Sequence, residues 1–240
     1  MVYIKIGILK GDLKEVIRTI IEAGSSTIGA CGDVSRNVMT SPAPFATKEY
    51  GYMRTYANII AELFKPQSTA LTKLWLGEEK VANVDYWLKD VGGIDVKAAM
   101  LKDTGRGVIL DDPVEPLYGS RYLPRKFKVA ITVPGDNSLD IYINDVGLVV
   151  ITDEYGELEG FNVMVGGGMG RTHNKEATFA RVAEHMGFVR KEDILEVLKC
   201  ILAAQRDYGN RDVRPQARMK YLVHEKGIDG FTKLVEVIQC

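Results

Sequence analysis

The chain has 240 residues, of which 46% are hydrophobic and 26% are charged, and its formal net charge is −1. This length and balance are typical of one large or two small globular domains with a sizeable core. No apolar run reaches the roughly 18 residues of a membrane helix, and the near-neutral charge argues against general affinity for polyanions, so an anion site must come from local clusters.

The three cysteines, Cys31, Cys200 and Cys240, are odd in number and widely spaced. This pattern predicts reduced thiols and a cytoplasmic or plastid-stroma location. The chain has no Cys-x-x-Cys motif and no Cys/His cluster, so we expect no metal site built by this chain alone.

The first part of the chain predicts two helices on either side of a glycine-rich loop. Apolar residues at i, i+3, i+4 and i+7 predict a helix from about Asp12 to Gly24, and a second helix is expected over 47–63. Between them, residues 29–38 are small and polar and are interpreted as a loop in which Arg36 could bind an oxyanion through its planar guanidinium. A solvated arginine in an ordinary loop is the alternative.

A buried strand is predicted over 127–133, closed by Pro134-Gly135. Its odd-numbered positions form an apolar face, whereas Lys126 and Lys128 share the opposite face about 7 Å apart. Like charges this close need solvent or an anion between them. The pair therefore indicates either two lysines reaching into water or an anion site, with Arg125 turned toward a second anionic group.

A glycine loop follows the later strands, which are predicted at 139–143, 147–152 and 160–165 with a hairpin turn between the last two. Four glycines occur within 166–170, and a helix is predicted over 175–186. A strand, a glycine loop and a helix in succession suit an anionic or planar ligand held against bare backbone. A simple tight turn is the alternative, because the run matches no standard nucleotide motif.

Helices are predicted over 192–208, 214–225 and 231–239. Arginines 206, 211, 214 and 218 cluster around the turn between the first two helices, as a solvated basic face or as part of a ligand site. Basic residues flanked by glycine thus occur in four places: Arg36, the group 125–128, Arg171 and the arginines from 206 to 218.

Together these groups indicate a ligand with several negative charges, and either a nucleotide or a polycarboxylate tetrapyrrole satisfies this requirement.

Four motifs in order carry a family resemblance. They are Gly29 to Val38, Leu123 to Lys128, Val165 to His173 and Gln205 to Arg211. Together they closely resemble assimilatory sulfite reductase, the haemoprotein of the nitrite/sulfite reductase family, and most of all its ferredoxin-dependent plant and cyanobacterial type. The resemblance implies an oxidoreductase of sulfate assimilation that reduces sulfite to sulfide by six electrons at a sirohaem iron coupled to a 4Fe–4S cluster.

The resemblance also implies roles for residues. Arg36, Lys126 and Lys128 match the family's cationic residues around bound sulfite, where they would hold the dianion, stabilise developing charge and supply protons. Sirohaem carries eight carboxylates, which suits scattered basic residues. Arg125 and Arg218 match contacts to cofactor carboxylates, and Gly166, Gly167, Gly168 and Met169 match the loop against the macrocycle. Asn37, Arg171 and His173 match residues that surround this site.

The sequence also departs from the family pattern. The family's four cluster cysteines lie in a C-terminal half that this chain lacks, so the resemblance implies that the cluster and iron ligands are absent here and that the chain alone is inactive. Residues 1–30 are expected to be a lead-in strand and helix, and residues 31–240 one copy of the family's repeated sirohaem-binding domain. Sulfite, ferredoxin and the rest of the same polypeptide are the implied partners.

The expected fold is α+β, with a mixed or antiparallel sheet of about five strands covered by helices. Two functional alternatives remain at this point. One is nitrite reductase of the same family, which the Lys126/Lys128 pair and the sequence Asp33 to Asn37 disfavour. The other is a non-catalytic tetrapyrrole- or nucleic-acid-binding module, with DNA binding opposed by the absence of a basic net charge.

Overall fold

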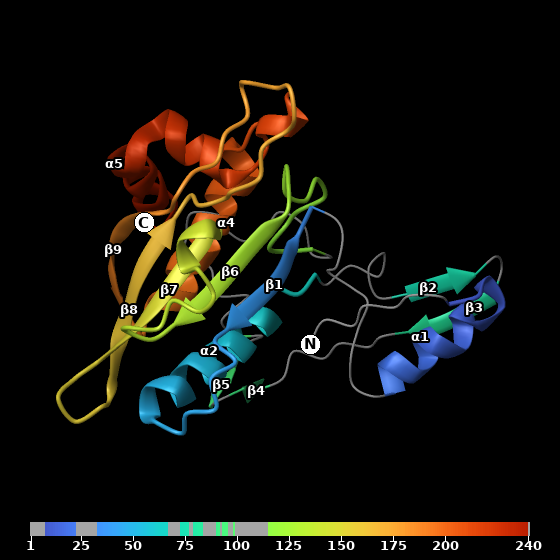
Figure 1. Cartoon of the computed structure of the whole chain (residues 1–240), viewed down its shortest axis with the longest axis horizontal. Helices are drawn as coiled ribbons and strands as arrows, with labels where there is room; N and C mark the ends of the chain where they lie inside the picture. Colours follow the sequence, from blue (N-terminus) through green and yellow to red (C-terminus); the bar gives the residue numbers. More distant parts are fainter. Residues whose placement is uncertain are drawn as a thin grey trace.

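The computed structural model describes residues 8–22, 33–66, 73–76, 79–83, 90–91, 93–95, 98 and 115–239 (Figure 1). Within these residues, a five-stranded sheet is covered by helices, which confirms the expected α+β class. The lead-in strand expected within residues 1–30 lies outside the described residues. No helix in the described part is long and apolar enough to cross a membrane.

The main sheet is mixed, with the order β1-β6-β7-β8-β9. β1, β6 and β7 are parallel to one another, whereas β8 runs antiparallel to both β7 and β9. Two short antiparallel ribbons, β2 with β3 and β4 with β5, are separate from it. The strands are β1 (Ser35–Thr40), β2 (Lys73–Leu76), β3 (Glu79–Asn83), β4 (Asp90–Val91), β5 (Ile94–Asp95), β6 (Phe127–Thr132), β7 (Val146–Thr152), β8 (Leu158–Val165) and β9 (Glu184–Arg190).

The helices match most of the apolar stripes in the sequence. The 3-10 turns are η1 (Lys10–Asp12), η2 (Ile141–Ile143) and η3 (Arg214–Gln216), and the α-helices are α1 (Leu13–Glu22), α2 (Lys48–Leu63), α4 (Ile194–Tyr208) and α5 (Met219–Gln239). α1 lies beside the β2–β3 ribbon, whereas α2, α4 and α5 surround the main sheet (Figure 1). α5 is kinked at Gly227 (φ 69°, ψ 166°), a conformation that is almost confined to glycine. This kink lies where the sequence predicted a break between two helices.

β6 is buried on both faces except at its beginning. Phe127, Val129 and Ile131 are fully buried in one core with side chains of α2 and α4. On the opposite face, Ala130 and Thr132 are also buried. Lys126 and Lys128 are only partly buried, so positive charge is concentrated where the chain enters this strand.

Residues 139–143 were predicted as a strand but contain η2. The Ile141 N–H donates to Asn137 Oδ1 at 3.1 Å, and Asp140 has a left-handed φ of 50°. Local side-chain hydrogen bonds of this kind compete with extended structure, and here they fold the segment into turns.

Two further expectations about elements were wrong. Residues 175–186, predicted as a helix, form the end of a loop and the beginning of β9, because pairing with the edge of β8 outweighs helix propensity. His185 therefore lies in a strand rather than a helix. The predicted loop at 29–38 becomes strand β1 from Ser35 onward, paired with β6.

The beginning of β1 is fixed by a buried tyrosine. The Tyr118 hydroxyl donates to the Phe64 carbonyl at 2.6 Å and accepts the Ser35 N–H at 3.1 Å. Tyr118 is 0% exposed, and this burial raises the pKa of its hydroxyl. The tyrosine thus joins the end of α2 to the residue that precedes Arg36.

Replacing Tyr118 with phenylalanine is expected to lower the free energy of unfolding by about 1–3 kcal/mol, because the Ser35 N–H and the Phe64 carbonyl would lose a partner in a buried place. Urea denaturation of the purified chain measures this change. Tyr155→Phe is the matched control, since Tyr155 is 75% exposed, and it should change the free energy by less than about 0.5 kcal/mol. Equal midpoints for both variants would contradict the assigned role.

Candidate functional site

A bulge in β1 brings Asn37 beside Lys128. Ser35 lies opposite Phe127 and Asn37 lies opposite Lys128, so Arg36 is the extra residue on β1. Directly paired residues share a face of a sheet, and the bulge therefore moves Asn37 onto the face of the lysines. Bulges commonly redirect side chains beside functional sites.

Cations from three segments gather around Lys126. Arg36 comes from β1, Arg125 and Lys128 flank Lys126 at the entry to β6, and Arg218 immediately precedes α5. Burial lowers the pKa of Lys126 below the usual lysine value, and repulsion from Arg218, Lys128, Arg36 and Arg125 lowers it further. The structure thus places the other four predicted basic residues within electrostatic range of Lys126.

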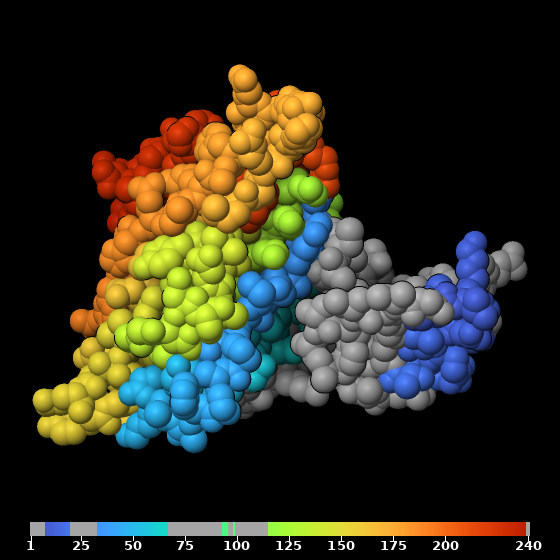
Figure 2. Space-filling view, in the orientation of Figure 1, coloured from blue at the N-terminus to red at the C-terminus, as the bar shows by residue number. Residues whose placement is uncertain are grey.

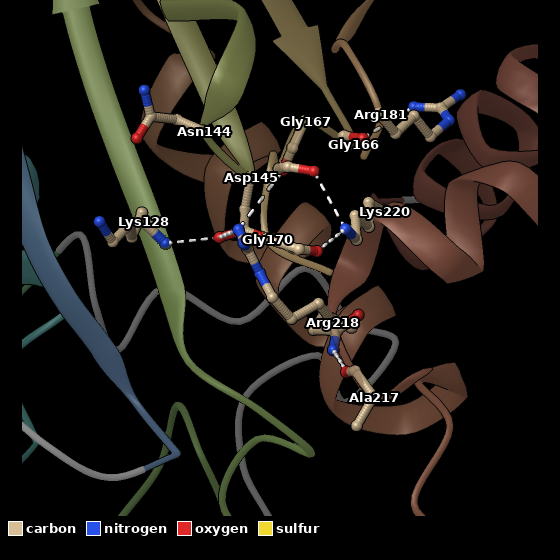
Figure 3. Close-up of polar contacts among 12 residues, drawn as sticks. Lys128, Asn144, Asp145, Gly166, Gly167, Gly170, Arg181, Ala217, Arg218 and Lys220 are labelled. Carbon is tan, nitrogen blue, oxygen red and sulfur yellow. Dashed lines mark hydrogen bonds and ion pairs between the residues drawn. The ribbon is translucent and has the colours of Figure 1, made fainter. Parts of the chain in front are cut away.

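One buried carboxylate lies against this cluster. Asp145, just before β7, is 0% exposed, and its Oδ2 accepts the Lys128 backbone N–H at 3.0 Å and Arg218 Nη2 at 2.7 Å (Figure 3). The Lys128 ammonium points away from this carboxylate. Burial raises the pKa of Asp145, whereas Arg218 and the Lys128 N–H act to lower it. Asp145 therefore neutralises part of the positive charge around Lys126 and Arg218.

Three buried polar atoms at this site have no hydrogen-bond partner within the described residues. They are Asn37 Oδ1, Asp145 Oδ1 and Arg218 Nε. Buried polar groups are normally paired, so unpaired ones indicate the position of a ligand or of bound water. Arg218 Nε is a donor, which an anionic ligand would satisfy, and the two oxygens suit water or a protonated group.

The predicted glycine loop joins β8 to β9 and lies against the start of α5. Gly166 has a positive φ of 82°. A Cβ at Gly166 would lie 2.8 Å from the Val223 Cβ, and a Cβ at Gly168 would lie 2.7 Å from Arg218 Nη1. Gly166 is therefore required by its backbone conformation and by the close approach of Val223, whereas a side chain at Gly168 would displace the Arg218 guanidinium.

The outer part of this loop carries the remaining predicted residues. Met169 is 51% exposed, and Arg171 and His173 are also exposed. This part projects from the body of the molecule, in orange at the top of Figure 2. These three residues thus lie on the exposed part of the loop, whereas Lys126 and Lys128 are partly buried.

Three of the four C-terminal arginines that the sequence grouped together support the backbone. Arg206 Nη1 donates to the Leu117 carbonyl at 2.9 Å, and Arg211 Nη2 donates to the Tyr122 carbonyl at 2.6 Å. Arg214 forms an ion pair with Asp33 at 3.1 Å. Arg206 and Arg211 thus hold the segment that leads into β6, Arg214 holds the residue two positions before β1, and of these four arginines Arg218 joins the candidate site.

Sequence reasoning missed two buried charged residues, Asp145 and Lys220. Lys220 is 1% exposed, and its ammonium contacts the glycine loop (Figure 3). The available signals were a carboxylate directly before an apolar strand and a lysine between the apolar residues Met219 and Leu222. Such charges must be paired when they are buried, which makes each of them a candidate for a specific contact.

Within the described part of the chain, no group of three or more His, Cys, Asp or Glu side chains could hold a metal ion. Cys200 is a buried cysteine in α4. Cys31 and Cys240 lie outside the described residues.

Comparison with known proteins agrees with the motif resemblance. The family model described as "Nitrite and sulphite reductase 4Fe-4S domain" matches residues 31–238. A ferredoxin sulfite reductase from Synechococcus elongatus is 57% identical over 233 residues, covering 97% of this chain and 36% of the relative. The NADPH sulfite reductase hemoprotein β-component of Shewanella sediminis is 40% identical and covers 96% of this chain and 36% of that protein.

The chain thus spans about a third of the length of the curated relatives that it matches. The fold is also similar to the solved NirA protein of Mycobacterium tuberculosis, with a TM-score of 0.59 and 23% identity, over 94% of this chain and 31% of that one. The family match covers most of the chain, from residue 31, four positions before β1, to residue 238 near the end of α5. The chain belongs to the nitrite and sulphite reductase family.

Proposed function

We propose that this chain supplies the sulfite-binding and sirohaem-contacting wall of a ferredoxin-dependent sulfite reductase, an enzyme that reduces sulfite to sulfide with six electrons. The observation that carries the proposal is the cluster of Arg36, Arg125, Lys126, Lys128 and Arg218, in which four cations lie close enough to Lys126 to lower its pKa and the buried Asp145 pairs with Arg218. The similarity to the Synechococcus elongatus ferredoxin enzyme supports ferredoxin as the electron donor.

The residues fit a polycarboxylate macrocycle. Arg218 has a buried Nε without a hydrogen-bond partner among the described residues, and it lies beside the glycine loop and the other cations around Lys126. In this proposal Arg125 and Arg218 bind cofactor carboxylates, with Asn37 beside them, and Gly166 to Gly168 approach the ring. Met169, Arg171 and His173 would reach the cofactor from the outer loop. The 4Fe–4S cluster would be held by residues outside this chain.

When it is bound, sirohaem with its coupled cluster supplies the electrons. The residues of this chain act on charge and protons. Arg36, Lys126 and Lys128 would bind the sulfite dianion through charge-assisted hydrogen bonds and stabilise negative charge that develops as S–O bonds break. The lowered pKa of Lys126 makes its ammonium a stronger acid than an ordinary lysine, which suits it to donate protons.

This proposal places the sirohaem-binding domain at 31–240, with 1–30 as a lead-in from a preceding half-domain. The remaining polypeptide of a longer enzyme and ferredoxin are the proposed protein partners, in the cytoplasm or plastid stroma. The curated relatives described above are sulfite reductases, which supports sulfite over nitrite as the substrate.

Titration of the purified chain with sirohaem tests the proposal. We expect the absorbance spectrum to show a shifted Soret-like band that saturates with added cofactor, together with no sulfite-dependent electron uptake by the chain alone. A Lys126→Met/Arg218→Met double variant should saturate at higher cofactor concentration or not at all. Unchanged spectra on addition of sirohaem to the wild-type chain would overturn the proposal for this chain.

A further inference from the structure

The first turn of α5 holds the glycine loop through a buried ammonium. Lys220 Nζ donates to the carbonyls of Gly168 at 3.0 Å and Gly170 at 2.7 Å, and it also donates to the Phe179 carbonyl. An ammonium has three donors, so three carbonyls satisfy it fully. Lys220 is 1% exposed, and its aromatic neighbour Tyr221 lies with its ring centroid 5.0 Å from Nζ.

These contacts join both arms of the loop. Gly168 and Gly170 lie on the arm that leaves β8, whereas Phe179 lies on the arm that returns toward β9. Arg181 fastens the base of the same loop, since its Nη1 donates to the Gly166 carbonyl at 2.8 Å. The ammonium is thus the central contact between α5 and a loop whose outer residues are exposed.

The direction of the carbonyls has a consequence for the neighbouring amides. A trans peptide is planar, and its C=O and N–H point in opposite directions. Because the Gly168 and Gly170 carbonyls point to Lys220, the N–H groups of Met169 and Arg171 point away from it. Neither N–H has a hydrogen bond to any described residue. Both donors therefore face the outer side of the loop, where a ligand or water can reach them.

We propose that Lys220 is the positioning residue of the glycine loop and that it keeps the Met169 and Arg171 N–H groups turned outward, where each can donate to an acceptor group of the cofactor. This inference rests on the proposed function for the identity of the ligand. The arrangement of the loop itself does not depend on that identity. Lys220 acts through the backbone and does not touch the ligand.

Limited trypsin digestion of the purified chain tests the positioning step without any cofactor. Arg171 and Lys175 are exposed tryptic sites within the loop. In Lys220→Met, which keeps the apolar stem and removes the three donors, cleavage at these sites should be about tenfold faster or more. Lys226→Met, an exposed lysine on the same helix, is the matched control and should be cleaved at the wild-type rate.

Hydrogen exchange with and without sirohaem tests the ligand step. In the wild-type chain the Met169 and Arg171 amides should gain protection on saturation with sirohaem, and in Lys220→Met they should not, with cofactor affinity about tenfold weaker and a displaced Soret-like band. Lys220→Gln, whose amide donates two hydrogen bonds, should be intermediate and serves if the methionine variant does not fold. Equal cleavage rates, or equal protection and band position, would overturn the inference. Absence of sirohaem binding by the wild-type chain would instead count against the proposed function and leave the digestion result to decide the role of Lys220.

Discussion

Replacing Arg218 with methionine is expected to lower the free energy of unfolding by about 3–5 kcal/mol at neutral pH. Asp145 is fully buried, and Arg218 is its charged partner at 2.7 Å. Removal of the guanidinium leaves a buried carboxylate whose remaining polar contact is the Lys128 N–H. Denaturation of the purified chain in urea, followed by circular dichroism, measures the change.

The sign of the pH dependence follows from the pKa of Asp145. Burial already raises this pKa in the folded chain, and loss of Arg218 removes the largest influence that lowers it. A carboxyl with a higher pKa in the folded than in the unfolded state binds protons more tightly when folded, so stability falls as pH rises through that window. The deficit of Arg218→Met should therefore shrink as the pH is lowered from neutral.

The matched control removes the buried charge as well. Asp145→Asn in the Arg218→Met background should recover most of the lost stability and abolish the extra pH dependence, because a neutral amide costs less to bury than an unpaired carboxylate. If the double variant were as unstable as the sum of the two single variants, Arg218 would act through packing and not through the ion pair.

The fold could be predicted where a single periodic pattern decides the structure. The strands at β6, β7 and β8 and the helices α2 and α4 follow from alternating or helical apolar patterns. Prediction failed where contacts with distant or neighbouring residues determine the secondary structure. β9 forms because β8 offers it an edge, and η2 forms because Asn137 bonds to the backbone of Ile141.

The candidate site shows the same division. Arg36, Lys126, Lys128 and Arg218 were identified from basic residues beside glycine and from the family motifs, and the structure brings them together. The bulge that aligns Asn37 with Lys128 depends on the register between two strands far apart in sequence, which no local pattern encodes. Lys220 escaped notice because a lysine in a helix is ordinarily exposed, and its burial depends on carbonyls of a distant loop.

Replacing Lys126 or Lys128 with methionine is expected to lower kcat/KM for sulfite by about 10²- to 10³-fold, the effect typical of losing one preorganised group at a developing charge. The assay uses a chimera in which this chain replaces the matching third of the Synechococcus elongatus ferredoxin sulfite reductase. The rate is followed as sulfite-dependent oxidation of reduced ferredoxin. Nitrite measured in parallel decides between the two family substrates.

A pH profile of kcat/KM distinguishes proton donation by Lys126 from charge stabilisation alone. Its pKa is lowered by burial and by the neighbouring cations, so the fraction in the ammonium form decreases at a lower pH than for an ordinary lysine. If Lys126 holds the dianion and donates protons, kcat/KM for sulfite should fall as pH rises through this lowered pKa, and Lys126→Met should lose that limb of the profile. Lys191→Met, an exposed lysine after β9, should retain both rate and profile. A full wild-type profile in Lys126→Met would show that the proton comes from another group, because a side chain without a titrating nitrogen cannot generate that limb.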